Sequence, residues 1–262
     1  MSFALAAAEE GGYEAPGVGD FWQPLVGDGP FALTRAAIAM VFSVALISGV
    51  LLFMTRRLSV VPTKPQMMLE GAYTFVRNGV GRDVIGGKEF LPYVPLLFSL
   101  FALILVNNIF GIVPFIQFPT MGRVGFPAAL AIVVYFVYHW VGIRRKGLGG
   151  YFGSFVPHGL PIFVVPFVWL LEFITYFFTR PVTLALRLFG NMFAGHILLL
   201  LFIAGGEYLL VHMDGVMKLT GVFALVMGFV MTIFEILVQF LQAYVFILLT
   251  AVYIQASIAD EH

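Results

Sequence analysis

Residues 179–202 read TRPVTLALRLFGNMFAGHILLLLF, an apolar stretch that contains two arginines, an asparagine and a histidine. An apolar stretch of about 18 residues or more is typical of a membrane-spanning helix. A charged side chain near the centre of such a helix costs about 2.5–3.5 kcal/mol even on the lenient insertion scale. The stretch therefore predicts a membrane helix that keeps costly charges, and ionisable groups retained inside a membrane are functional by default.

The composition of the whole chain agrees with a membrane location. Of its 262 residues 61% are hydrophobic and 11% are charged, whereas soluble domains are about 25% charged. Lys plus Arg and Asp plus Glu number 14 each, so no net positive field indicates a nucleic-acid partner. The absence of cysteine excludes disulfides, thiolate metal sites and cysteine nucleophiles. We expect one all-α integral membrane domain over residues 1–262.

The basic residues between the apolar stretches predict the orientation of the chain. Lysine and arginine collect in the connections 55–90 and 143–160, whereas residues 1–30 are acidic and contain neither. Basic connections mark the cytoplasmic side of a membrane protein, so we expect an external segment 1–30 and a cytoplasmic C-terminus. Three spans, at about 31–54, 93–114 and 126–143, are expected within the region 31–160.

The connection after the first span contains an amphipathic stretch, PQMMLEGAYTFVRNGV, at 65–80. Apolar Met68 and Ala72 lie on one face of a helix, and polar Gln66 and Glu70 lie on the other. This pattern predicts a short helix in the cytoplasmic interface of the membrane. A solvated connector is the alternative interpretation.

Asn107 and Asn108 lie together near the outer end of the second span. Paired asparagines in a span usually hydrogen-bond to neighbouring helices. The alternative is that they line an aqueous access path, and the pattern leaves both interpretations open.

The last two apolar segments, 161–204 and 216–256, are too long for ordinary spans. Forty helical residues extend about 60 Å, whereas the hydrocarbon layer is about 30 Å thick. Each segment must break into two spans or tilt strongly, and Arg180-Pro181 is the candidate break in the first. We expect two long, strongly tilted helices that form an antiparallel hairpin over 161–262, with its external turn in GGEYLLVHMDG, 205–215.

The polar residues of this hairpin follow helical spacing. One face of a helix, about 80° wide, contains Arg180, Thr183, Arg187 and Asn191. Glu172 lies at the edge of that face, and His196 lies about 180° from Arg187. Glutamate and histidine can exchange protons, whereas arginine keeps its proton and acts as a fixed charge. On the last helix the stripe consists of Glu235, Gln239, Gln242, Phe246 and Tyr253.

Simpler structural roles are the alternatives for these charges. Arg180 can pair with Glu172, and Arg187 can pair with Glu235. Arg180 can also extend its side chain to the cytoplasmic interface, as long basic side chains do near helix ends.

Two stretches resemble a known family. RPVTLALRLFGNMFAGH at 180–196 and FEILVQFLQAYVFILLTAVYI at 234–254 are similar to the signatures of subunit a of the F-type ATP synthase, the membrane stator of its proton channel. The resemblance extends over most of the chain, since the interfacial helix and the closing hairpin also fit.

The resemblance implies a role for each site residue. Arg187 matches the essential arginine that faces a carboxylate of the rotating c ring, and Asn191 matches the polar residue one turn further on. Gln242 matches the glutamine that approaches the arginine from the last helix. His196 and Glu235 match a histidine/acid pair divided between the two helices, and Glu172 matches an acid near the other half-channel.

The resulting prediction is a proton-translocating stator subunit with no catalytic site, cofactor or metal of its own. An external half-channel with Glu235, His196 and Gln239 delivers protons to the c ring, an internal one near Glu172 receives them, and Arg187 separates the two. The implied partners are the c ring, peripheral stalk subunit b, the F1 sector indirectly and membrane lipid, in a bacterial plasma membrane. The alternative is a secondary transporter or ion channel with an intramembrane charge relay.

Overall fold

The computed structural model describes residues 24–26, 33–56, 62–87, 89–113, 120–155 and 161–259. The acidic segment 1–30 lies outside the described residues except for three positions. Within the described ranges the chain is helical, apart from a ribbon of β1 (Pro24–Val26) and β2 (Leu33–Thr34) that pair antiparallel. Five of the described helical stretches are long and apolar enough to cross a membrane, which confirms the predicted all-α membrane class.

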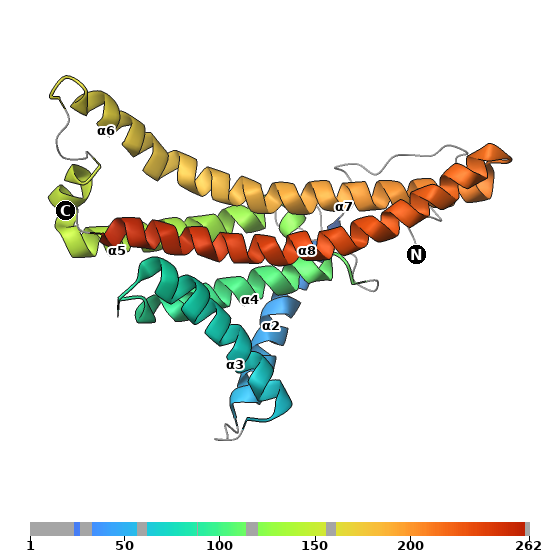
Figure 1. The fold of residues 1–262 in the computed structure, drawn as a ribbon, viewed down its shortest axis with the longest axis horizontal. Coiled ribbons are helices and arrows are strands. Elements are labelled where there is room, and N and C mark those ends of the chain that lie inside the picture. The colour runs from blue at the N-terminus through green and yellow to red at the C-terminus, as the bar shows by residue number, and fades with distance from the viewer. Residues whose placement is uncertain are drawn as a thin grey trace.

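The helices follow one another along the chain with short connections (Figure 1). The longer ones are α2 (Arg35–Thr55), α3 (Lys64–Val76), α4 (Val94–Phe110), α5 (Gly125–Gly153), α6 (Val165–Ile174), α7 (Arg180–His212) and α8 (Val216–Ile258). The π-helices are η2 (Arg77–Ile85) and η5 (Thr175–Thr179), and the 3-10 turns are η3 (Leu91–Tyr93) and η4 (Thr120–Gly122).

The predicted interfacial helix forms as α3 and continues as η2. Its apolar Met68 is 78% exposed, as a membrane-facing side chain would be, but Gln66, expected on the polar face, is only 5% exposed. Gln66 donates a hydrogen bond of 2.7 Å to Glu70. Phe75 lies 5.6 Å from the ring of Tyr244 on α8, so the segment packs against the closing hairpin as well.

The closing hairpin consists of two long helical arms that run side by side in opposite directions (Figure 1). The first arm is continuous from Val165 to His212 over 48 residues, and the second, α8, has 43 residues. The expectation of two long helices rather than four short spans is therefore confirmed. An arm of 48 residues extends about 70 Å and fits a hydrocarbon layer of about 30 Å only when it is tilted or bent.

The hairpin turn is shorter than expected and lies further along the chain. The predicted turn 205–215 contains the observed turn but is too long, because α7 continues to His212 and only the next three residues connect the arms. Gly206 serves helix packing instead: a Cβ atom there would lie 3.1 Å from the Gly221 carbonyl oxygen on α8. Gly215, with φ of 65°, is the glycine that the turn requires.

A π-wound turn explains why Arg180-Pro181 does not break the first arm. Proline has no N–H to donate, and in η5 the Arg180 N–H bonds to the Thr175 carbonyl, five residues earlier. With the same five-residue spacing, the donor to the Tyr176 carbonyl would be the nitrogen of Pro181, which carries no hydrogen. The hydroxyl of Tyr138 on α5 donates to that carbonyl instead, at 2.6 Å.

The third span is longer than expected. The sequence predicts an end near residue 143, whereas α5 runs to Gly153 with a change of direction at Gly147, where φ is 70°. Only glycine adopts such a backbone angle readily. The bend turns the end of α5 so that Tyr151 packs against Gly142, leaving no space for a Cβ atom at that glycine.

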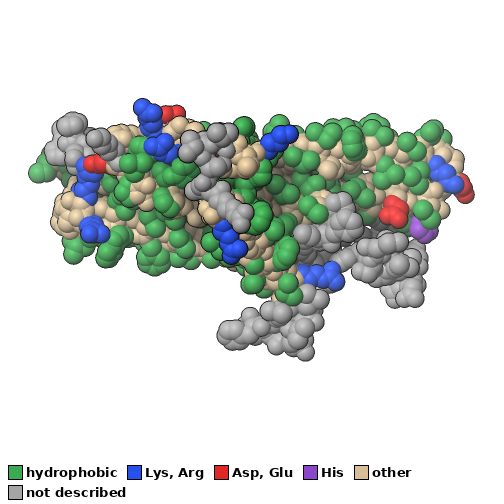
Figure 2. All heavy atoms as spheres, turned by 90° about the horizontal axis from the view of Figure 1, so that it is seen from below, with side chains coloured by type: hydrophobic (Ala, Val, Ile, Leu, Met, Phe, Trp, Pro, Cys, Tyr) green, Lys and Arg blue, Asp and Glu red, His purple; other side chains and the backbone are tan. Residues whose placement is uncertain are grey.

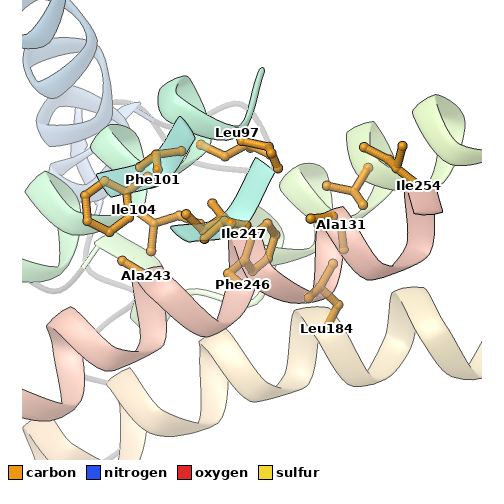
Figure 3. Packing of buried hydrophobic residues seen from close by; sticks show 14 of the residues in the cluster. Leu97, Phe101, Ile104, Ala131, Leu184, Ala243, Phe246, Ile247 and Ile254 are labelled. Carbon is orange, nitrogen blue, oxygen red and sulfur yellow. The ribbon is translucent and has the colours of Figure 1, made fainter. Parts of the chain in front are cut away.

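The buried core lies where α4, α5, α7 and α8 meet (Figure 3). It includes Leu97 and Ile104 from α4, Ala131 from α5, Leu184 from α7 and Phe246 from α8. Helix α2 contributes little, since only 6% of its apolar window is buried within the chain. Hydrophobic side chains cover much of the face seen in Figure 2, as expected for helices that meet lipid.

Candidate functional site

The two predicted polar stripes meet along the hairpin in an antiparallel register. Asn191 Nδ2 on α7 donates a hydrogen bond of 2.6 Å to Gln242 Oε1 on α8. Further along the same seam, the guanidinium carbon of Arg180 lies 5.0 Å from the centre of the Tyr253 ring. The structure thus brings the predicted residues Asn191 and Gln242 into direct contact.

Glu235 occupies a buried position on α8 about two turns before Gln242. Its side chain is 6% exposed, and its Oε1 accepts a hydrogen bond of 3.3 Å from Gln239 Nε2 on the next turn of α8. On α7 the facing residue is Gly195, where an added Cβ atom would lie 3.4 Å from Glu235 Oε1. Gly195 was not singled out from the sequence, and it lies directly against the carboxyl group.

A cleft of about 400 Å³ opens between α7 and α8 at this point. Its polar lining comes from Asn191, Glu235, Gln239 and Gln242, and the rest is apolar. Buried Gln239 Oε1 and Gln242 Nε2 have no hydrogen-bond partner among the described residues. Polar atoms of this kind are the sites where ordered water binds in proteins, so the arrangement can hold a short chain of water beside a carboxyl group.

His196 is 5% exposed and follows Gly195 directly, on the turn of α7 that faces Glu235. Its imidazole therefore belongs to the buried side of α7. Among the described residues, no group of three or more His, Asp or Glu side chains forms a metal-ligand cluster.

Arg187 is exposed, unlike the buried Glu235, Gln239 and Gln242. Within the described part of the chain its guanidinium takes part in no hydrogen bond or ion pair, and the described ion pairs lie elsewhere, at Arg145–Glu89 and Lys218–Asp214. The alternative pairing of Arg187 with Glu235 does not form. The charge therefore faces outward from an apolar helix hairpin.

Glu172 lies apart from this group, on α6 and before the π-wound turn. It is half-buried, it does not line the cleft, and its alternative pairing with Arg180 does not form among the described ion pairs. The structure therefore does not bring Glu172 together with the other predicted site residues.

The two asparagines of α4 have different surroundings. Asn107 Nδ2 donates to Ser43 Oγ at 2.8 Å and its Oδ1 accepts from Thr120 Oγ1 at 2.7 Å, so Asn107 joins helices as the first interpretation expected. Asn108 donates to the Gln239 carbonyl at 3.2 Å. Its buried Oδ1 has no partner among the described residues, so Asn108 extends the polar region of the cleft toward α4.

Arg180 has aromatic neighbours that the sequence did not predict. Its guanidinium carbon lies 3.4 Å from the centre of the Tyr176 ring and 5.0 Å from that of Tyr253. The π-wound turn places Tyr176 one turn before Arg180, and α8 supplies Tyr253. The cation is thus held between two aromatic faces, a contact that helical spacing on one segment cannot reveal.

Replacing Arg180 by lysine is expected to destabilise the hairpin. An ammonium lacks the planar group that stacks on both rings, and a desolvated cation–π contact contributes about 0.5–2 kcal/mol. The midpoint of thermal unfolding of the detergent-solubilised protein should fall, while exposed Arg144→Lys should leave it unchanged. Equal midpoints for both variants would contradict the stacking role.

The fold and the site define a polytopic helical membrane protein whose closing hairpin carries a seam of polar and ionisable groups. The family model described as ATP synthase A chain matches residues 37–255. The chain belongs to this family.

Named relatives support the same assignment over the full length. ATP synthase subunit a of a Nocardioides species is 42% identical to this chain over 277 aligned residues, and the alignment covers 100% of both chains. The subunit of Pseudarthrobacter chlorophenolicus is 41% identical, with 100% of both chains covered. That of Streptomyces lividans is 39% identical over 96% of this chain and 90% of the relative.

Proposed function

We propose that this chain is the proton-conducting stator subunit of the membrane sector of an ATP synthase, coupling proton flow to ATP synthesis. The observation that carries the proposal is the exposed Arg187, which has no acidic partner among the described residues. A permanent cation on an apolar helix needs a counter-charge. A carboxylate of a neighbouring, rotating c ring supplies that charge without locking Arg187 inside its own chain.

The cleft between α7 and α8 serves as the external half-channel. Water in the cleft reaches Glu235, and Gln239, hydrogen-bonded to that carboxyl group, lies next along the path. His196, on the facing turn of α7, completes the relay. From there the Asn191–Gln242 contact leads to the exposed face that carries Arg187.

Transfer to the ring neutralises its carboxylate, which then moves through lipid without a charge. After one rotation the carboxyl group meets the internal half-channel near Glu172, releases its proton and returns ionised to Arg187. Because arginine does not release its own proton, it separates the two half-channels. The electrical part of the driving force is about 2.3 kcal/mol per charge per 100 mV.

The partners follow from this role: the c ring on the Arg187 face, peripheral stalk subunit b, the F1 sector indirectly, and lipid around the remainder. We propose a bacterial plasma membrane, since the named relatives are bacterial. The ion pair between Arg145 and Glu89 joins the two basic connections at one end of the molecule. This contact supports a cytoplasmic location for both connections, and the N-terminus is then on the outside of the membrane.

Affinity purification in a mild detergent tests the proposal. We expect a tagged chain to co-elute with a small ring-forming proteolipid and with soluble nucleotide-binding subunits, and the complex to make ATP in vesicles from an imposed pH difference. A monodisperse single chain that carries a solute or ion by itself would instead favour the secondary transporter or ion channel.

A further inference from the structure

Among the residues that the structure describes, buried polar atoms without a hydrogen-bond partner lie at two separate ends of the hairpin seam. At one end are Asn108 Oδ1, Gln239 Oε1 and Gln242 Nε2, beside the cleft. At the other are His139 Nε2 and Arg180 Nη1. Because such atoms bind water, water is expected at both ends of the same seam.

An apolar layer lies between these ends. We define it as Ala131 of α5, Leu184 and Leu188 of α7, and Phe246 of α8, each 2% exposed or less. Figure 3 shows Phe246 and Leu184 on facing helices, with Ala131 beside them. The α8 segment from Gln242 to Tyr253, which contains Phe246, is about 16 Å long at 1.5 Å per residue.

The hydroxyl groups near the layer do not interrupt it. Thr250, which is fully buried, donates to the Phe246 carbonyl at 2.8 Å. Thr183 donates to the Thr179 carbonyl at 2.7 Å. Each is satisfied within its own helix, so neither offers the two to four polar partners that hold a buried water.

Arg187 cannot block the passage of protons through the interior of the chain, between the two ends of the seam. It lies between Leu184 and Leu188 in the sequence, but its side chain is exposed on the outer face of α7. Its charge therefore acts at the surface that meets a neighbouring subunit. The interior between α5, α7 and α8 needs a separate barrier to protons.

We propose that the apolar layer centred on Phe246 is a dry seal that prevents protons from passing between the two wet ends inside this chain. The inference rests on the proposed function, because a leak matters only where two half-channels carry protons. Phe246 acts by excluding water, since protons cross an apolar gap poorly without a continuous hydrogen-bonded chain.

The test uses the whole ATP synthase in vesicles, with a c ring whose proton-binding carboxylate is replaced by its amide. Such a ring cannot carry protons, so any remaining conductance passes outside the rotary route. With Phe246→Ala we expect a proton leak, driven by a potassium diffusion potential, at least tenfold above that of the unaltered chain. The matched control is Phe229→Ala on the same helix, where the ring is 70% exposed, and it should show no added leak.

Two further variants separate sealing from general damage. Phe246→Leu keeps an apolar side chain in the layer and should leave the leak near background. Leu184→Ala opens the same layer from α7 and should leak, which also keeps the test available if the Phe246→Ala complex fails to assemble.

An assembled Phe246→Ala or Leu184→Ala complex that leaks no more than the Phe229→Ala control would overturn the seal. Failure of the proposed function has a different signature: the unaltered complex with its native ring would show no proton conductance, or the amide ring would not remove it.

Discussion

Replacing Arg187 by alanine is expected to abolish proton-driven ATP synthesis while the complex still assembles. Arg187 is exposed and contributes no hydrogen bond or ion pair within the described chain, so its removal leaves the core intact. The ring carboxylate, however, loses its counter-charge. An unpaired charge at mid-membrane costs about 2.5–3.5 kcal/mol, which corresponds to a rate loss of about 60- to 300-fold at 1.4 kcal/mol per factor of ten.

The measurement is ATP synthesis by vesicles under an imposed pH difference, with subunit content checked on a native gel. Arg187→Lys keeps the positive charge as a compact ammonium and should recover only part of the rate, because the guanidinium is planar and keeps its proton more firmly. Lys218→Ala, at the hairpin turn in an exposed ion pair, is the control and should be silent. Persistence of coupled synthesis in Arg187→Ala would remove Arg187 from the centre of the mechanism.

Replacing Glu235 by glutamine is expected to slow proton passage through the membrane sector by about 100-fold, the lower range for a positioned proton-transfer group. Glutamine has nearly the same shape and keeps an oxygen that accepts from Gln239, so the packing over Gly195 should persist. The amide cannot take up and release a proton as a carboxyl group does. The loss should therefore appear in conductance and not in assembly.

Passive proton conductance of vesicles stripped of the F1 sector provides the readout. The matched control is Glu207→Gln, an exposed acid near the far end of α7 that does not line the cleft, and its conductance should stay unchanged. If Glu235→Gln conducted as well as this control, the cleft would not be the proton path.

The fold was predictable wherever a single segment decides its own structure. The number of long apolar helices follows from apolar length alone, whereas the continuity of the first closing arm also depends on the π-wound turn η5. The hairpin turn was predicted too long because Gly205 and Gly206 have the composition of a turn, yet Gly206 lies against Gly221 of the facing helix. A glycine that permits close packing and one that permits a turn cannot be distinguished until the opposite element is known.

The candidate site, like the fold, was predictable from the sequence only in part. Helical spacing placed Arg187 and Asn191 on one face and predicted the stripe that contains Glu235 and Gln242. It could not predict that Gly195 lies against the Glu235 carboxyl group, or that Arg180 lies over the ring of Tyr253. Each of these contacts joins residues more than 35 positions apart, and their meeting depends on the register between two helices.

The order of residues by itself therefore determined that this chain lies in a membrane, that its last two helices exceed the bilayer thickness, and that they keep ionisable groups at a cost in free energy. These properties depend on transfer from water to lipid and on a helix repeat of 3.6 residues, which act along one segment. Only the tertiary structure decided which side chains face each other, which remain exposed as Arg187 does, and which are fully buried between helices as Phe246 is. The contacts and exposures of these side chains depend on how α5, α7 and α8 pack together, because packing alone selects among the many registers that the same polar stripes allow.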